Sequence, residues 1–194
     1  MPTEQEAWWA SDFGKSYTAR NRVQWNLRVP FWRDIIDWVE PESVLEVGAN
    51  AAWNLRAIKA IRRDIELKGI DVNPVAIAEA TAAGFDVEEM SALDVGSRWP
   101  NEFDLTFSAG VLIHVGPDHI HEAMDSIIAA SRQYVLAIEY AAKTEEEVQY
   151  RGHSERLWRR PFAEMYEDKG LILIERGDAG LGFDKCEYAL LRKD

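Results

Sequence analysis

The sequence of 194 residues has a single cysteine, Cys186, and no long apolar run. One cysteine cannot form an internal disulfide, so a reducing compartment such as the cytoplasm is expected. No segment approaches the roughly 20 apolar residues that a membrane-spanning helix needs. Acidic and polar residues follow Met1, instead of a basic stretch and an apolar core, so we expect no signal peptide.

Positive charge is scarce: Lys and Arg number 22 against 34 Asp and Glu, which gives a net charge of −12 at pH 7. Such a chain is repelled by phosphate backbones and by anionic lipid headgroups. We therefore expect a small-molecule partner, with no nucleic acid and no membrane. The His, Cys and carboxylate residues also lack metal-ligand spacing such as H-E-x-x-H, so we predict no metal.

The length predicts a single domain over residues 1–194, and 47% apolar residues are enough to form a core. Five of the eight tryptophans lie in the first 38 residues. Apolar residues recur there at helical spacing, at Val23, Leu27, Phe31, Ile35 and Trp38. Pro30 should kink or divide this pattern. Residues 1–40 are therefore predicted to form a helical cap of two or three helices, on a core of residues 41–194.

The core alternates apolar strands with helical segments. The predicted strands are 43–48, 65–71, 86–90, 103–109 and 134–140, and the predicted helices are 53–63, 73–83 and a segment that begins at Pro117. This alternation predicts βαβ units and a doubly wound parallel sheet. Two last strands, 170–176 and 185–192, leave no room for a helix between them and should pair antiparallel. The predicted fold is α/β and Rossmann-like, with a mostly parallel seven-stranded sheet that ends in an antiparallel hairpin.

Three residues are expected at the carboxyl ends of the strands, where open α/β sheets bind ligands. Gly48 follows the first strand and lets backbone N–H groups approach a ligand. Asp71 ends the second strand, 71 − 48 = 23 positions later, where an acid that holds a ribose is expected. Asp94 follows the third strand and could accept from an exocyclic amine. Each has a simpler explanation alone, as a turn or a helix cap, but together they favour a nucleoside-containing ligand.

The loop after Gly48 lacks the other glycines of a pyrophosphate-binding G-x-G-x-x-G motif. Asn50 and Ala52 stand at those positions. This disfavours a nicotinamide or flavin dinucleotide, and hence an oxidoreductase. A ligand with ribose and adenine but no phosphate fits better.

These motifs resemble those of class I S-adenosylmethionine-dependent methyltransferases, over roughly residues 12–192. The resemblance rests on Val44–Gly48, Gly69–Asn73, Ser91–Asp94, Phe103–Ser108 and Gly110–His114. The chain departs from the family's Gly-rich loop at Asn50, Ala51 and Ala52. A narrower resemblance, to methylases associated with pseudaminic acid biosynthesis, rests on Asp12–Gly14, Tyr17–Asn21, Asn50, Asn54–Arg56 and Tyr150–His153.

The resemblance implies S-adenosyl-L-methionine as cofactor and a role for each matching position. Its methionine part would lie among Glu46, Gly48 and Asn50. Asp71 would hold the ribose, Asn73 would lie beside the adenine, and Leu93 with Asp94 would frame the base. The fourth strand would contribute Ser108, Ala109 and Gly110. A lid from the N-terminal segment would carry Tyr17, Arg20 and Asn21, with Arg20 available to pair the cofactor carboxylate.

Methyl transfer needs an in-line nucleophile and a dry site, and a base only where the nucleophile must lose a proton. His114 is the first candidate base, because it follows the fourth strand and titrates near neutrality. The alternative is a histidine bonded to a loop carbonyl. Glu139 and Tyr140, at the end of the fifth strand, are the next catalytic candidates. His119 and His121 are expected to face solvent.

Residues 150–160 reverse the charge of this acidic chain, with four arginines in ten residues. Arginine binds carboxylate and phosphate bidentately, so this segment is predicted to bind substrate through Tyr150, Arg151, His153 and Arg156. The alternative is that these arginines pair with the glutamates at 145–147.

The sequence thus predicts methyl transfer to a small, anionic metabolite, such as an acidic sugar or an amino-acid derivative. The alternative is a non-catalytic protein that has kept the cofactor site. Either a monomer or a homodimer is compatible with the sequence, since Trp8 and Trp9 could form a subunit contact.

Overall fold

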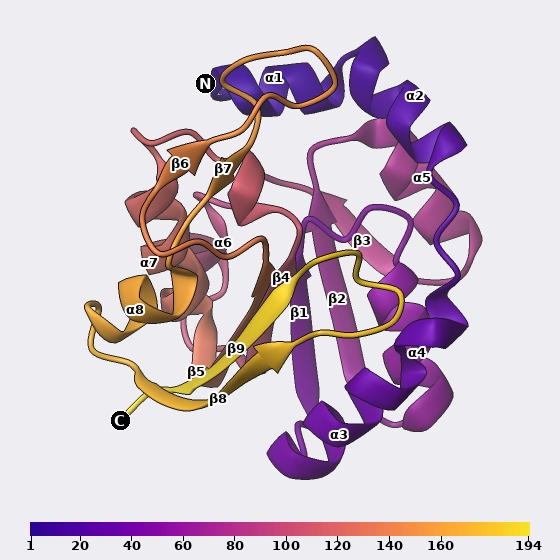
Figure 1. The fold of residues 1–194 in the computed structure, drawn as a ribbon. Coiled ribbons are helices and arrows are strands. Elements are labelled where there is room, and N and C mark those ends of the chain that lie inside the picture. Colours follow the sequence, from indigo (N-terminus) through magenta and orange to yellow (C-terminus); the bar gives the residue numbers. More distant parts are fainter.

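A seven-stranded sheet forms the centre of the protein, in a computed structural model that describes residues 1–194 (Figure 1). Its strands are β1 (Ser43–Val47), β2 (Glu66–Asp71), β3 (Asp86–Glu89), β4 (Phe103–Ala109), β5 (Ser131–Glu139), β8 (Ile172–Asp178) and β9 (Glu187–Arg192). They lie in the order β3-β2-β1-β4-β5-β9-β8. β1 to β5 are parallel, and β9 runs antiparallel to both β5 and β8. This confirms the predicted doubly wound sheet and its terminal hairpin.

Helices cover both faces of the sheet, which explains why β1 is buried along its whole length. One face packs against α3 (Val29–Val39), α4 (Trp53–Ile61) and α5 (Pro74–Ala82). The other packs against α6 (Val95–Arg98), α7 (Ile120–Ala130) and α8 (Phe162–Glu167). Asn73 caps α5, since its Oδ1 accepts from the Val75 N–H at 3.0 Å.

Residues 1–40, the predicted cap, contain α1 (Glu4–Ala10), α2 (Asp12–Arg20), a 3-10 turn η1 (Trp25–Arg28) and α3, of which α3 packs into the core. Pro30 divides the apolar pattern by standing in the first turn of α3. The predicted apolar face was wrong in part: Leu27 and Trp38 are exposed by 39% and 49%, whereas Trp32 is fully buried. Leu27 lies in η1, outside the helix that buries Ile35, so the spacing does not continue one face across η1; Trp38 lies in the last turn of α3.

α1 and α2 lie across the end of the sheet where the parallel strands finish, and α3 lies near the opposite end (Figure 1). The chain from β5 to α8 forms a ribbon, β6 (Glu146–Glu147) with β7 (Trp158–Arg159), whose connecting loop reaches α1. The ring centroids of Trp8, in α1, and of His153, in this loop, lie 5.6 Å apart. Two segments more than 140 residues apart therefore meet over the strand ends.

None of the helices has the length and apolar character required to cross a membrane.

Candidate active site

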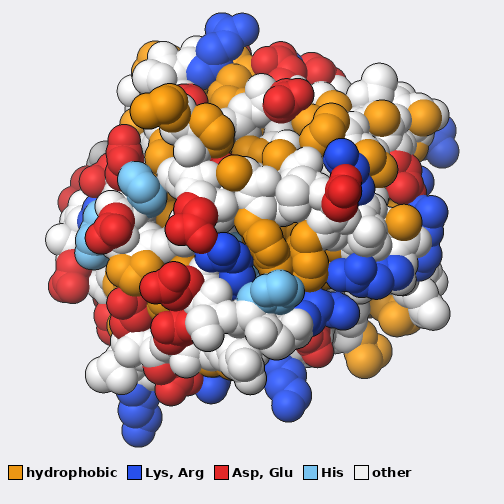
Figure 2. Space-filling view, turned by 90° about the horizontal axis from the view of Figure 1, so that it is seen from above, with side chains coloured by type: hydrophobic (Ala, Val, Ile, Leu, Met, Phe, Trp, Pro, Cys, Tyr) orange, Lys and Arg blue, Asp and Glu red, His pale blue; other side chains and the backbone are white.

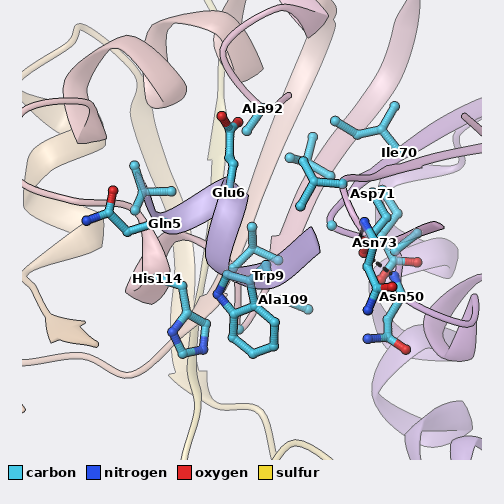
Figure 3. A pocket seen from close by; sticks show the side chains of 18 of the residues that line it. Gln5, Glu6, Trp9, Asn50, Ile70, Asp71, Asn73, Ala92, Ala109 and His114 are labelled. Atoms are coloured by element: carbon cyan, nitrogen blue, oxygen red, sulfur yellow. Dashed lines mark hydrogen bonds between the residues drawn. The ribbon is translucent and has the colours of Figure 1, made fainter. Parts of the chain in front are cut away.

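A cavity of about 200 Å³ lies at the carboxyl ends of β1, β2 and β4. α1 and α2 contribute one wall, through residues that include Gln5, Glu6, Trp9 and Tyr17. Asn50, Asp71 and Asn73 lie together on one side of the cavity, across from Trp9 and His114 (Figure 3). Most of the predicted cofactor positions line it: Tyr17, Asn21, Glu46, Gly48, Asn50, Asp71, Asn73, Leu93, Ala109 and Gly110. Arg20, Asp94 and Ser108 do not.

The loop after β1 makes a tight turn without the usual glycines. Gly48 has φ +74°, and a Cβ there would lie 2.3 Å from Val111 Cγ2, so only glycine lets the two loops approach this closely. Asn50 and Ala52 also have left-handed φ angles, of 48° and 61°. Asn50 tolerates this conformation, and its Oδ1 accepts from the Ala51 N–H at 2.8 Å. The loop thus has left-handed residues at Asn50 and Ala52 as well as at Gly48.

Glu46 lines the cavity and is only 2% exposed. Its Oε1 accepts from Asn54 Nδ2 at 2.7 Å, whereas Oε2 is buried and has no hydrogen-bond partner. Burial raises the pKa of Glu46 to about 8. A buried polar atom without a partner carries a penalty of roughly 1–3 kcal/mol. Such an atom in a cavity wall is a position where a ligand donor can restore the missing bond.

Arg28 is a cavity residue that the sequence analysis missed. It lies in η1, and its guanidinium donates to Asn54 Oδ1 and to the Gly182 carbonyl, both at 2.8 Å. The same Asn54 amide thus binds Glu46 on one side and Arg28 on the other. Nothing in the local sequence distinguishes Arg28 from Arg20 or Arg22, because only the path of η1 brings it to the cavity.

Asp71 ends β2 and holds two backbone turns. Its Oδ2 accepts from the Asn50 N–H at 2.7 Å, and its Oδ1 accepts from the Asn73 N–H at 2.8 Å. Desolvation raises its pKa above the ordinary value. A carboxylate oxygen accepts more than one bond, so each oxygen keeps capacity for a ligand hydroxyl.

Thr18 links the cap to these two loops. Its side chain is buried in α2, and its Oγ1 accepts from Asn73 Nδ2 at 3.2 Å and from Asn50 Nδ2 at 3.5 Å. Gly14 lets α1 cross α2 closely, because a Cβ there would lie 1.7 Å from the Trp9 carbonyl oxygen. The Asn50 side chain therefore makes a tether that glycine at this position could not make.

The side of the cavity after β3 is mainly apolar, with Met90, Ala92 and Leu93 in its wall. Asp94 is exposed at the start of α6 and does not face the cavity. Glu6 of α1 stands on this side instead, pointing towards Ala92 (Figure 3) and hydrogen-bonded to Ser91 Oγ. The acid comes from a helix far away in sequence, which spacing along the strands could not reveal.

His114 lines the cavity next to the Trp9 ring, whose centroid is 4.7 Å away. Its Nδ1 lies 2.5 Å from the Arg156 carbonyl oxygen. A carbonyl only accepts, so Nδ1 carries the proton and Nε2 keeps its lone pair. Burial lowers the pKa of His114 to about 4, so the ring is neutral at pH 7. The bond to the loop carbonyl thus leaves the Nε2 lone pair available, but the lowered pKa makes His114 a weaker base than the ordinary histidine expected from the sequence.

The other two catalytic candidates lie away from the cavity lining. Glu139 Oε1 accepts from Ser108 Oγ at 2.8 Å, which also turns Ser108 away from the cavity. The backbone N–H groups of residues 111–113 donate to the same Glu139 carboxylate. The Tyr140 hydroxyl hydrogen-bonds to Asp184. Both side chains are thus engaged with other parts of the protein.

The arginine segment divides into paired and unpaired residues. Arg159 pairs with Glu146 at 2.8 Å and Arg160 with Glu145 at 2.6 Å, which is the alternative that the sequence left open. Arg156 pairs with Glu4 of α1 at 2.7 Å. Tyr150, Arg151, His153 and Arg156 all lie outside the cavity lining.

Arg151 is the member of this segment that approaches a cavity residue without a carboxylate partner. Its guanidinium lies 6.0 Å from the ring centroid of Tyr17. Arg20 lies at the same distance from the same ring and 5.3 Å from the Phe13 ring, again with no ion pair. Figure 2 shows this end of the molecule, where hydrophobic side chains reach the surface among charged ones.

No protein-family model matches the chain, and a comparison with curated proteins finds no match. Solved structures do match. Over the whole chain, the fold is similar to that of a Burkholderia thailandensis 1,6-didemethyltoxoflavin-N1-methyltransferase with bound 1,6-didemethyltoxoflavin and S-adenosylhomocysteine. The two are 17% identical with a TM-score of 0.74, and the match covers 100% of this chain and 90% of that one.

Two further structures are similar. The magnesium protoporphyrin IX methyltransferase of Synechocystis, with bound S-adenosylmethionine, has a TM-score of 0.70 at 11% identity, over 100% of this chain and 99% of that one. A sugar N-methyltransferase of Streptoalloteichus has a TM-score of 0.69 at 10% identity, and the match covers 95% of this chain and 94% of that one. The chain therefore has the Rossmann-like fold of class I S-adenosylmethionine-dependent methyltransferases.

Proposed function

We propose that the protein transfers a methyl group from S-adenosylmethionine to a small molecule. The unpartnered Oε2 of buried Glu46, close to Arg28, is the observation that carries this proposal. A carboxylate and a guanidinium joined through one amide suit the ammonium and carboxylate of an amino acid. Asp71 lies in the same cavity and suits the hydroxyls of a ribose. S-adenosylmethionine contains both an amino acid and a ribose.

Val111 and the apolar residues that follow β3 form a wall that suits the adenine ring. Gly48 has no side chain, so the backbone there can approach the middle of the ligand. When bound, S-adenosylmethionine supplies a methyl group on a positively charged sulfur. Trp9 and Tyr17, from the cap, exclude water from this region. His114 holds an Nε2 lone pair that can take a proton from an acceptor atom.

The acceptor that these residues suit best is acidic. Arg20 and Arg151 carry charges with no carboxylate partner and flank Tyr17 at the edge of the cavity. Guanidinium groups in this position favour a carboxylate or phosphate on the acceptor. The resemblance to methylases associated with pseudaminic acid biosynthesis agrees with an acidic sugar, and an amino-acid derivative has the same charge.

Calorimetry with S-adenosylmethionine, S-adenosylhomocysteine and NADH tests the proposal. We expect both sulfur compounds to bind and NADH not to bind. Glu46→Gln should weaken S-adenosylmethionine binding at least tenfold, while Glu42→Gln, an exposed control, should leave it unchanged. If neither sulfur compound binds, the proposal is wrong.

The alternative of a non-catalytic binding protein is tested by turnover. The purified protein, S-adenosylmethionine and a panel of acidic sugars and amino-acid derivatives should release S-adenosylhomocysteine for at least one acceptor. Tight cofactor binding with no turnover on any acceptor would favour the binding protein.

A further inference from the structure

The short 3-10 turn η2 (Leu112–His114) follows β4 and is held at its N-terminal end by Glu139. Glu139 Oε1 accepts from the N–H groups of Val111 and Leu112, at 3.2 and 3.1 Å, and Oε2 accepts from that of Ile113 at 3.4 Å. These are N–H groups that a helical turn leaves without internal partners. The carboxylate, at the end of β5, is 1% exposed.

Arg160 holds the carbonyl side of the same segment. Its two terminal nitrogens donate to the carbonyl oxygens of Leu112 and Val115, both at 2.9 Å. Its Nε donates to Glu145 at 2.6 Å, and the residue is fully buried. Burial raises the pKa of Glu139 to about 7, so above that pH the turn has an anion at its N–H end and a cation at its carbonyl end.

The segment between these two charges carries residues that face the cavity. Val111 packs against Gly48 of the cofactor loop, and His114 lines the cavity beside Trp9. The second restraint on His114 is its bond to the Arg156 carbonyl, four residues before Arg160 in the chain. Glu139 and Arg160 thus act on the position of His114 without lining the cavity themselves.

We propose that Glu139 and Arg160 are positioning residues, which hold the 111–115 segment from both ends so that His114 and Val111 keep their places in the site. Glu139 acts through the backbone and does not contact the substrate. Two buried charges are a costly way to hold a short turn, but a carboxylate can accept from four donors at once and a guanidinium can bind two carbonyls and an acid. A neutral side chain cannot do either. The catalytic part of this inference rests on the proposed function.

Two disruptive variants, one charge-preserving variant and one matched control separate positioning from general stability. Glu139→Gln keeps the size of the side chain but puts an NH₂ group where N–H groups donate. Arg160→Met removes the donors at similar length, and Arg160→Lys keeps the charge. Arg159→Met is the control, because the neighbouring Arg159 is exposed and pairs with Glu146 outside the segment.

The first readout needs neither cofactor nor acceptor. Amide hydrogen exchange of residues 111–115 should be at least tenfold faster in Glu139→Gln and Arg160→Met than in Arg159→Met. The NMR titration of His114, assigned with His114→Asn, should move towards the ordinary histidine range in these two variants alone. Unchanged exchange and an unchanged titration would overturn the inference, even if the protein proves not to bind S-adenosylmethionine.

The second readout is kinetic. We expect kcat to fall at least tenfold in both variants and by a larger factor than the cofactor affinity falls through Val111, and Arg160→Lys to restore part of kcat. A parallel loss of kcat, cofactor affinity and melting temperature would show general destabilisation and overturn the positioning role. Absence of cofactor binding by the wild-type protein would instead contradict the proposed function, and the hydrogen-exchange result would still decide the inference.

Discussion

Glu46 and Arg28 share one amide, because Asn54 donates to the carboxylate of the first and accepts from the guanidinium of the second. The three side chains come from β1, α4 and η1. The shared amide fixes the separation between a negative and a positive group in the cavity wall. Both charges are largely removed from solvent, so each depends strongly on what else enters the cavity.

Cofactor affinity should increase with pH up to about 8. The pKa of Glu46 is raised to about 8 by burial, so at pH 6 the carboxyl is protonated and must lose a proton to accept from an ammonium group. Binding at pH 6 should therefore release a proton, and binding above pH 8 should not. Calorimetry in buffers of different ionisation enthalpy measures this release. An equal proton release by Glu46→Gln would contradict the assignment.

Glu46 should also make stability depend on pH. In the unfolded chain its pKa is near 4.5, and in the folded protein it is about 8, so folding favours the protonated form. The Glu46 contribution to the free energy of unfolding is therefore greatest below pH 4.5 and falls as pH rises to 8. The melting temperature of Glu46→Gln minus that of the wild type should therefore increase as the pH rises from 5 to 8. Glu42→Gln should show no such trend.

Gly48→Ala should destabilise the protein more than Gly84→Ala. Both glycines have φ angles near 80°, which cost an alanine roughly 1–2 kcal/mol. At Gly84 nothing lies within 4 Å of the added methyl, whereas at Gly48 it would meet Val111. Denaturant unfolding measures the difference, which isolates the clash from the backbone strain. Equal destabilisation would mean that the two loops do not approach this closely.

Thr18→Val should loosen the cap while preserving the shape of the side chain. The change leaves the Asn50 and Asn73 amides without their shared acceptor, at a cost of roughly 1–3 kcal/mol. Hydrogen exchange over residues 12–20 should become faster, and cofactor affinity should fall. The exposed Ser16→Ala in the same helix is the control. Unchanged exchange in Thr18→Val would show that α2 is held by apolar packing alone.

Arg151→Gln and Arg20→Gln should raise KM for an acidic acceptor and leave the cofactor Kd unchanged. Each exposed charge is worth up to about 1 kcal/mol, or about fivefold in KM, and the effect should shrink in high salt. Arg192→Gln, another exposed arginine, is the control. If KM is unchanged in the double variant, the acceptor is not held by these arginines.

The parts of this fold that follow from local pattern were predictable from the sequence. The strand ending at Val47 is a short, mostly apolar run before a glycine turn, and the separation of Gly48 from Asp71 follows from one βαβ unit. Arg28 and Glu6 were missed because they enter the cavity from the cap, whose position depends on tertiary packing. Spacing along a chain carries no information about such contacts.

The arginine segment shows the same limit. Its charge pattern allowed both an anion clamp and pairs with the nearby glutamates. The ribbon of β6 and β7 decides this for Arg159, since it places Glu146 opposite that residue. Asp94 was expected in the site because it follows a strand, but it is the exposed residue that precedes α6 and does not line the cavity.

A crystal structure with S-adenosylhomocysteine tests the central claim most directly. The account predicts that the ligand's ammonium group lies within hydrogen-bond distance of Glu46 Oε2, with its carboxylate near Arg28 and its ribose hydroxyls on Asp71. A ligand bound with its amino-acid end away from Glu46, or a saturated crystal with no ligand in this cavity, would contradict it.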